Sequence, residues 1–212
     1  MKHIFVSLTV LLFGLSMMGL AQSGDNSEAF IEQVINEKWE GTFDEDDLSG
    51  IPASLDDIVD NAISLYQSRG LLGNTAYIYQ YESGNLSNVQ QTGTGHFHYS
   101  VQDGPNNDMN SSLIGTNNMS IMLQRGNSNE ANLSFDGDWL GGIIVQDGDN
   151  NVFDQSVSGV SNKLFKVIQE GDGNVLNHID NTGFALPMEI RQSGGARLML
   201  INGPIPVRMQ GN

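Results

Sequence analysis

Glutamine recurs through most of the chain at a spacing that could give its side chains a common chemistry. The series is Gln80, Gln102, Gln124, Gln146, Gln169 and Gln192, and its period is nearly constant. A primary amide carries two donor protons and an acceptor oxygen with two lone pairs. If these residues lie one above another, their amides can bond along the stack as a ladder, which offsets the cost of burying them.

Glycine and asparagine follow these glutamines at fixed offsets. The unit Gln-x-Gly-x-x-Asn supplies Gly104, Gly126, Gly148, Gly171 and Gly194, and also Asn85, Asn107, Asn129, Asn151 and Asn174. Only Glu82 and Arg197 interrupt the pattern. Both residue types tolerate positive φ, and asparagine also bonds its neighbouring backbone. The unit therefore predicts a tight turn after each glutamine, with the asparagines as a second ladder.

Metal binding and catalysis find weaker support in the sequence. His96 and His98 would share one face of a strand, but no third ligand is evident and His178 is distant. Asp147-Gly-Asp149 and Gly171-Asp-Gly-Asn174 are similar to calcium-binding β-roll turns, yet turn formation explains them better because the repeat is far longer than the β-roll period. There is no Ser-His-Asp order, phosphate loop or pair of carboxylates in a credible pocket. We therefore expect no enzyme, cofactor or metal centre.

Composition limits the partners. The 212 residues include 25 acids and nine bases, and the net charge of −16 argues against nucleic acid or an anionic membrane surface as a partner. The chain has no cysteine, so packing and backbone hydrogen bonds must stabilise it. Only 39% of the residues are hydrophobic and 25 are glycine, which argues against a conventional helical or α/β enzyme core.

Residues on both sides of each predicted turn alternate in character, as β-strands do. Met122 precedes Gln124 by two positions, so the two side chains lie on the same face of their strand. Leu133 follows Asn129 by four positions and shares a face with it in the same way. One repeat cannot close a core alone, so repeats must stack, with equivalent strands about 4.8 Å apart. The sequence predicts an all-β fold over residues 74–212. This is a two-sheet β-solenoid of cross-β type, with strand, turn and strand in each rung and one rung for each glutamine of the series.

Residues 1–21 have the pattern of a secretory signal peptide. Lys2 gives a basic start, the run from Ile4 to Leu20 is almost wholly apolar, and Gly19 and Ala21 are small residues before a cleavage site. The alternative is a retained membrane helix, but no basic stop-transfer flank follows. We expect residues 1–21 to be removed and the mature chain not to insert into a membrane.

Residues 22–73 form an acidic segment before the repeats, with twelve acids and two bases. Apolar residues recur at helical spacing from Phe30 to Trp39 and from Ile58 to Tyr66, which predicts two short amphipathic helices. Residues 41–52 between them have the character of a solvated linker and lack the ligand spacing of an EF-hand. The segment is either an export tag or a cap folded over the first rung, and the sequence leaves both open.

The repeat resembles the curlin repeat of bacterial curli fibres, whose consensus runs Ser-x5-Gln-x-Gly-x-x-Asn-x-Ala-x3-Gln. Residues 74–91 follow it closely, including the core Ile78-Tyr-Gln80-Tyr and the closing Gln91, and the resemblance covers about two thirds of the chain. The later repeats depart from it at two positions. The opening serine position holds Asn74, His96, Asn118, Leu140, Lys163 and Leu186, and the closing glutamine position later holds Leu113, Phe135, Val157, Asp180 and Gly203.

This resemblance implies a secreted bacterial protein, extracellular or on the cell surface, that assembles into the functional amyloid of a biofilm matrix. It also implies export through outer-membrane secretion machinery, and self or a related curlin subunit as the partner. A role as nucleator is one alternative within the family, because residues 188–212 carry Arg191, Arg197 and Arg208 against Glu189 alone. The minor curli subunit is similar in ending with a basic repeat, although any terminal repeat can diverge. Outside the family, a capped monomeric β-solenoid acting as an adhesin or binding module is the alternative.

Overall fold

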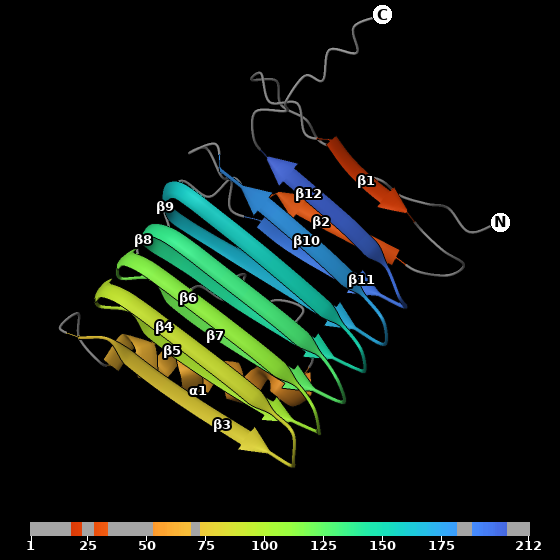
Figure 1. Ribbon diagram of the computed structural model, residues 1–212, viewed down its shortest axis with the longest axis horizontal. Helices are drawn as coiled ribbons and strands as arrows, with labels where there is room; N and C mark the ends of the chain where they lie inside the picture. The colour runs from red at the N-terminus through yellow and green to blue at the C-terminus, as the bar shows by residue number, and fades with distance from the viewer. Residues whose placement is uncertain (1–17, 23–27, 34–52, 69–72, 182–187, 203–212) are drawn as a thin grey trace, which may run out of the picture.

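The computed structural model describes residues 18–22, 28–33, 53–68, 73–181 and 188–202, most of which form one β-solenoid (Figure 1). In chain order the elements are β1 (Met18–Gln22), β2 (Glu28–Gln33), α1 (Ala53–Ser68), β3 (Thr75–Tyr81), β4 (Leu86–Thr94), β5 (Phe97–Asp103), β6 (Asp108–Thr116), β7 (Met119–Arg125), β8 (Glu130–Asp147), β9 (Val152–Glu170), β10 (Val175–Asp180), β11 (Met188–Ser193) and β12 (Arg197–Asn202).

Each repeat contributes one strand to each of two stacks. The first stack contains β3, β5, β7, the second halves of β8 and β9, and β11. The second stack contains β4, β6, the first halves of β8 and β9, β10 and β12. Because β8 and β9 bend through both stacks, all twelve strands belong to one sheet. The prediction of an all-β solenoid is confirmed, and pairing between successive repeats is parallel throughout.

The register between repeats follows the spacing in the sequence. Gln80 lies opposite Gln102, and each later glutamine of the series lies opposite the next. The one shift falls between β8 and β9, where Gly137 pairs with Val160 although Asp136 pairs with Ser158. Gly159 is therefore a bulge residue, and it accounts for the spacing of 23 residues between Gln146 and Gln169, where Gln124 and Gln146 are 22 apart.

The main core lies between the two stacks. Burial alternates along the strands of the second stack, as in β6 and β10, so every second side chain points inward. The inward residues include Met109, Leu133, Phe135, Phe153 and Phe165, all with exposure of 2% or less. This is the thin apolar layer that the alternation predicts.

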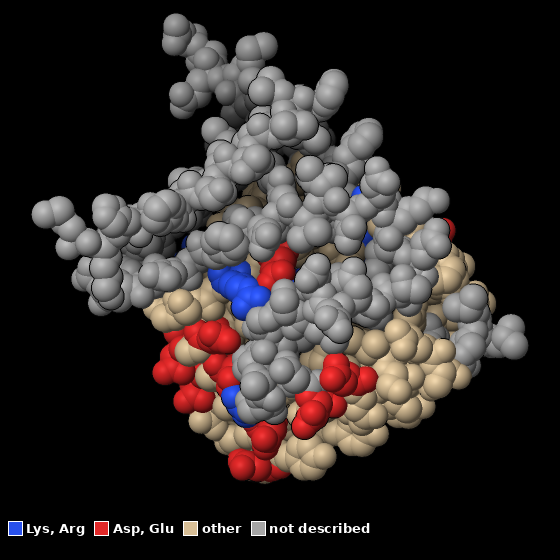
Figure 2. Space-filling view, turned by 180° about the vertical axis from the view of Figure 1, so that it is seen from behind, with Lys and Arg blue, Asp and Glu red and all other residues tan. Residues whose placement is uncertain are grey.

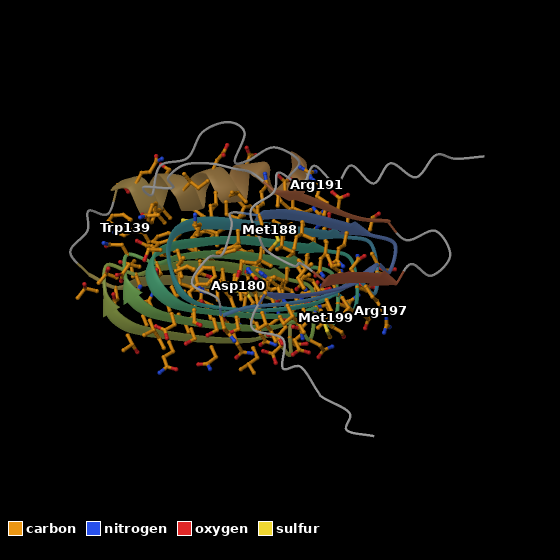
Figure 3. The ribbon with its side chains drawn as sticks, turned by 90° about the horizontal axis from the view of Figure 1, so that it is seen from above. Trp139, Asp180, Met188, Arg191, Arg197 and Met199 are labelled. Atoms are coloured by element: carbon orange, nitrogen blue, oxygen red, sulfur yellow. The ribbon has the colours of Figure 1, made fainter. Side chains whose placement is uncertain are left out.

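A second core lies outside the first stack and involves α1. In β5 and β7, six successive residues are buried, so these strands are covered on both faces. Val59, Ala62, Ile63 and Tyr66 belong to the same apolar cluster as the outward residues of the first stack, such as Phe97. Figure 3 shows the helix lying along this face of the solenoid. Within the described residues, no helix has the length and apolar character needed to cross a membrane.

At the first of the two helices predicted in the acidic segment, the structure differs from the prediction. Glu28–Gln33 form a strand, β2, where the sequence predicts the start of a helix, while residues 34–39 lie outside the described residues. β2 pairs antiparallel with β11, and Phe30 and Ile31 are residue types that favour strands, so a strand edge in need of partners outweighs a weak helical pattern.

The segments before the repeats cover the last rung rather than the first. β1, which contains the last four residues of the predicted signal peptide, pairs antiparallel with β12. Together β1 and β2 follow the edges of the last rung, at the end of the solenoid opposite β3 (Figure 1). The second predicted helix falls within α1, which packs on the side of the first stack.

Candidate functional site

The six glutamines of the first stack form a continuous ladder of amides. Each side-chain nitrogen donates to the amide oxygen of the glutamine in the next rung, over 2.7, 2.9, 2.8, 2.8 and 2.7 Å from Gln80 to Gln192. Parallel pairing in register brings the side chains to the same height on each strand, and the alternation turns them inward. The five glutamines from Gln102 onward are buried, and Gln80 at the first rung is exposed.

The second amide proton of each buried glutamine bonds to the opposite stack. Gln102 donates to the carbonyl of Leu86 at 2.9 Å, and Gln124 donates to that of Asp108 at the same distance. The same bond recurs for the remaining glutamines, at 2.9, 3.0 and 2.9 Å, from Gln146 to Glu130, from Gln169 to Val152 and from Gln192 to Val175. One side chain thus connects neighbouring rungs and also the two stacks, and its polar atoms are satisfied without water.

The asparagines form a second ladder at the turn beside the glutamines. The side-chain oxygen of Asn107 accepts from the backbone N–H of Asn129 at 3.0 Å and from its amide at 3.1 Å. The amide of Asn107 donates to the carbonyls of Gly104 and Gly126, at 2.9 and 2.8 Å. Equivalent axial bonds join Asn85 to Asn107, Asn129 to Asn151, Asn151 to Asn174 and Asn174 to Ala196.

The predicted turn glycines occupy the left-handed conformation that the sequence motif implies. Positive φ occurs at Gly104, Gly126, Gly148, Gly171 and Gly194. Gly126 shows why no other residue serves here: at φ of +105°, an added Cβ would overlap the carbonyl oxygen of Gly148 in the next rung. Close backbone approach between rungs and positive φ therefore both require glycine.

A third ladder at the opposite bend escaped the sequence analysis. The Asn74 side chain accepts from the backbone N–H of His96 at 3.0 Å, and Asn118 accepts from that of Leu140 at 2.9 Å. Between them, the Nδ1 atom of His96 accepts from the backbone N–H of Asn118 at 3.2 Å. The sequence motif gives these positions no role beyond a departure from the serine of the curlin consensus. The signal was the separation of Asn74 from Asn118 by two repeat lengths, with a histidine midway.

The three histidines among the described residues lie in different environments. His96 lies at the bend, where its Nε2 is 3.0 Å from the carbonyl of Thr92. His98 lies inside the solenoid with 0% exposure, neither ring nitrogen has a hydrogen-bond partner, and burial lowers its pKa to about 4. Burial also lowers the pKa of His178 to about 4, against an opposing effect of Asp180. Among the described residues, no group of three or more histidine or acidic side chains could hold a metal ion.

Charged residues beside the glutamines form a short axial series on the outside of the first stack. Asp103, Arg125, Asp147 and Glu170 lie opposite one another in successive rungs. Arg125 donates through Nε to Asp147 at 2.7 Å and through Nη2 to its other oxygen, and this bonding raises the pKa of Arg125. The alternation of sign favours this stacking order at the middle rungs. Elsewhere acids dominate, as Figure 2 shows for the face seen from behind.

The ladders end at an open strand edge at the first rung. Within the described residues, β3 pairs only with β5, and β4 pairs only with β6. Four of the large apolar side chains that are exposed lie on this rung, namely Ile78 (43%), Tyr79 (41%), Tyr81 (55%) and Leu86 (57%). An open edge with apolar side chains is a template for another strand.

These features define the site as an arrangement of backbone and amide groups repeated along one axis. It has the chemistry of association through hydrogen bonds, without a described cluster of metal-binding side chains. Comparison of the chain with models of protein families, with curated proteins and with solved structures finds no match.

Proposed function

We propose that the protein is a secreted, curli-like subunit, a two-sheet cross-β solenoid that assembles through its strand edges into extracellular fibres of a bacterial surface or biofilm matrix. The observation that carries the proposal is the glutamine ladder, which joins every rung to the next and ends at the exposed Gln80. Stacked amides in parallel, in-register strands are typical of cross-β assemblies.

The open first rung supports the same proposal. The strand edges of β3 and β4 offer unpaired backbone groups, and the exposed end of the ladder offers an amide oxygen to a further chain. Under this proposal, residues 1–21 direct export, the outer-membrane machinery completes it, and the partner is another copy or a related curlin subunit. Neither a cofactor nor a catalytic residue is required.

The proposal is tested by incubating residues 22–212 and following thioflavin fluorescence and X-ray fibre diffraction. We expect fibres with a reflection at about 4.8 Å along the fibre axis. Gln124→Leu should lengthen the lag phase, because each buried amide left without a partner costs about 1 to 3 kcal/mol. Gln67→Leu is the matched control, since Gln67 is an exposed glutamine on α1, outside the ladder and away from the strand edges. Absence of fibres, or equal lag phases for the two variants, would contradict the proposal.

A second candidate is a capped monomeric solenoid that acts as an adhesin or binding module. It is favoured by β2, which pairs with β11 and covers that edge of the last rung. β1 pairs with β12, but it lies almost wholly in residues 1–21, which export would remove. A particle mass that stays monomeric over a hundredfold range of concentration, together with no thioflavin signal, would support this candidate against the first.

The fibre proposal includes two roles, a main subunit and a nucleator. Figure 3 shows Arg191 and Arg197 on the two strands of the last rung, the region whose basic character resembles the minor curli subunit. A nucleator should shorten the lag phase of a second curlin subunit at a small molar fraction, whereas a main subunit should make up the bulk of the fibre.

A further inference from the structure

The two ends of the solenoid differ in how their strand edges are covered. At the last rung, β2 pairs with β11 over Met188–Ser193, and β1 pairs with β12 over Arg197–Ile201. At the first rung, no described strand pairs with the outer edges of β3 and β4. β1 belongs almost wholly to residues 1–21, which the proposed export removes, so the cover that remains in residues 22–212 is β2 on β11. Head-to-tail stacking needs the edges of both β11 and β12, so a second copy that docks without displacing β2 meets the described part of this chain at the first rung.

The first rung is also nearly free of charge. Residues 74–95 contain Glu82 as their one acidic residue and no lysine or arginine, in a chain with a net charge of −16. Two copies can therefore approach through this rung with little repulsion. The same rung exposes the apolar side chains of Ile78, Tyr79, Tyr81 and Leu86. A second copy that docks on this rung would bury part of this apolar surface.

We propose that the first rung binds the first rung of a second copy, with β3 antiparallel to β3 and β4 antiparallel to β4 across a two-fold axis. A rotation about the normal to the stacks reverses both the strand direction and the solenoid axis. It keeps each stack in its own plane, so both strand edges pair at once. Such an interface is closed and self-complementary, which is the commonest arrangement of homodimers.

The register of this pairing follows from the strand centres. Ile78 is the central residue of β3, and centring the axis there places it opposite the Ile78 of the second copy. Tyr77 then lies opposite the second copy's Tyr79, which makes two cross-strand aromatic pairs on the outer face. The bond between Gln91 and the carbonyl of Thr75 relates β4 to β3 across the interior. Val89 is two positions before Gln91 and Ile78 is three positions after Thr75, so we infer that these two inward residues lie close to each other across the interior. Val89 is one residue from the centre of β4, so both edges are paired over most of their length.

This pairing rests on the edge-to-edge assembly proposed above, but it does not require fibres. Head-to-tail stacking would instead place β3 beside β11 of another copy, and β2 holds that edge. The dimer is accordingly the first association step, and growth from its outer ends needs β2 to leave β11.

Single cysteines distinguish the two arrangements, because the chain contains none. Ile78→Cys places a thiol on the two-fold axis, so residues 22–212 carrying it should form a disulfide-linked dimer on mild oxidation without a second variant. Head-to-tail stacking places Ile78 beside Ile190 of another copy, following the row of register that runs from Ile78 to Ile190. In that arrangement, Ile78→Cys should crosslink only when mixed with Ile190→Cys. Ser112→Cys, on the outer face of β6, is the control and should stay monomeric.

Sedimentation of the cysteine-free protein provides a second readout. We expect a concentration-dependent dimer at micromolar concentration, and we expect Ile78→Lys to shift it to monomer by placing a charge at the edge. Crosslinking only in the mixture, or a monomer at all concentrations, would overturn the proposal. Crosslinking of Ile78→Cys alone without fibres would refute the fibre function and leave the dimer in place. Fibres together with crosslinking only in the mixture would refute the dimer and support the fibre function.

Discussion

Each inner glutamine has all its amide atoms bonded within the protein. Gln146 accepts from Gln124 at 2.8 Å, and it donates to Gln169 at 2.8 Å and to the carbonyl of Glu130 at 2.9 Å. The glutamine partners are themselves buried, so water cannot replace a lost bond. The energetic importance of such a residue therefore lies mainly in the groups that its removal would leave unpaired.

We predict that Gln146→Leu lowers the free energy of unfolding by about 3 kcal/mol, because three groups lose their partners. Gln80→Leu should lower it by about 1 kcal/mol, because Gln80 is itself exposed and only one group, the amide oxygen of Gln102, loses its partner. Urea unfolding followed by circular dichroism measures both values. Equal losses for the two variants would mean that the ladder contributes no more in the interior than at its end.

At the scale of elements, α1 determines which face of the solenoid meets water. Its residues Val59 and Ala62 have 0% exposure, and Tyr66 packs edge-on against Phe97 of β5 with ring centroids 5.4 Å apart. A helix of 16 residues is marginal in water by itself, so this packing stabilises both the helix and the apolar face beneath it. The helix is thus part of the folded unit.

We predict that Ile63→Ala lowers the free energy of unfolding by about 2 to 5 kcal/mol, as for other large-to-small changes in a core. Asp60→Ala, on the exposed side of the same helix, should change it by less than about 0.5 kcal/mol. Thermal and urea unfolding of residues 22–212 provide the measurement. If both substitutions are silent, α1 is dispensable for the fold and acts only as a tag.

The placement of α1 marks the limit of what the sequence could predict. Helical spacing is a local pattern, and α1 lies over the second of the two segments in which it occurs. The face it covers depends on non-local contacts, for which the available signal was the near-continuous apolar run in strands such as Met119–Arg125. β2 illustrates the opposite case, since its strand depends on the edge of β11, which lies near the other end of the chain.

Over the whole molecule, repetition made the prediction strong. The nearly constant period of the glutamines determined the number of rungs, the register and the inward side of each strand, because every repeat tests the same assignment. Positions that vary between repeats gave no such support. His96 therefore passed unnoticed as a ladder member, although its ring nitrogen replaces an amide oxygen in the same place.

The interior histidines link the stability of the whole solenoid to pH. Burial lowers the pKa of His98 and of His178 to about 4, while in the unfolded chain both return to the ordinary value of 6.5. Between these values the unfolded chain binds more protons than the folded one, so the free energy of unfolding rises with pH. The stabilisation is complete above pH 6.5 and is lost progressively as the pH falls toward 4.

We predict that lowering the pH from 7.5 to 5 costs about 2 kcal/mol of stability for each of these histidines. The double variant His98→Leu, His178→Leu removes both titrating groups, so its loss over the same interval should be smaller by about 4 kcal/mol. Urea unfolding at the two pH values measures the difference between parent and variant. The interval lies above the ordinary pKa of carboxyl groups, which separates the histidine effect from general acid unfolding. Parallel pH profiles for the two proteins would show that the imidazoles reach water in the folded state, which would contradict the complete burial of His98.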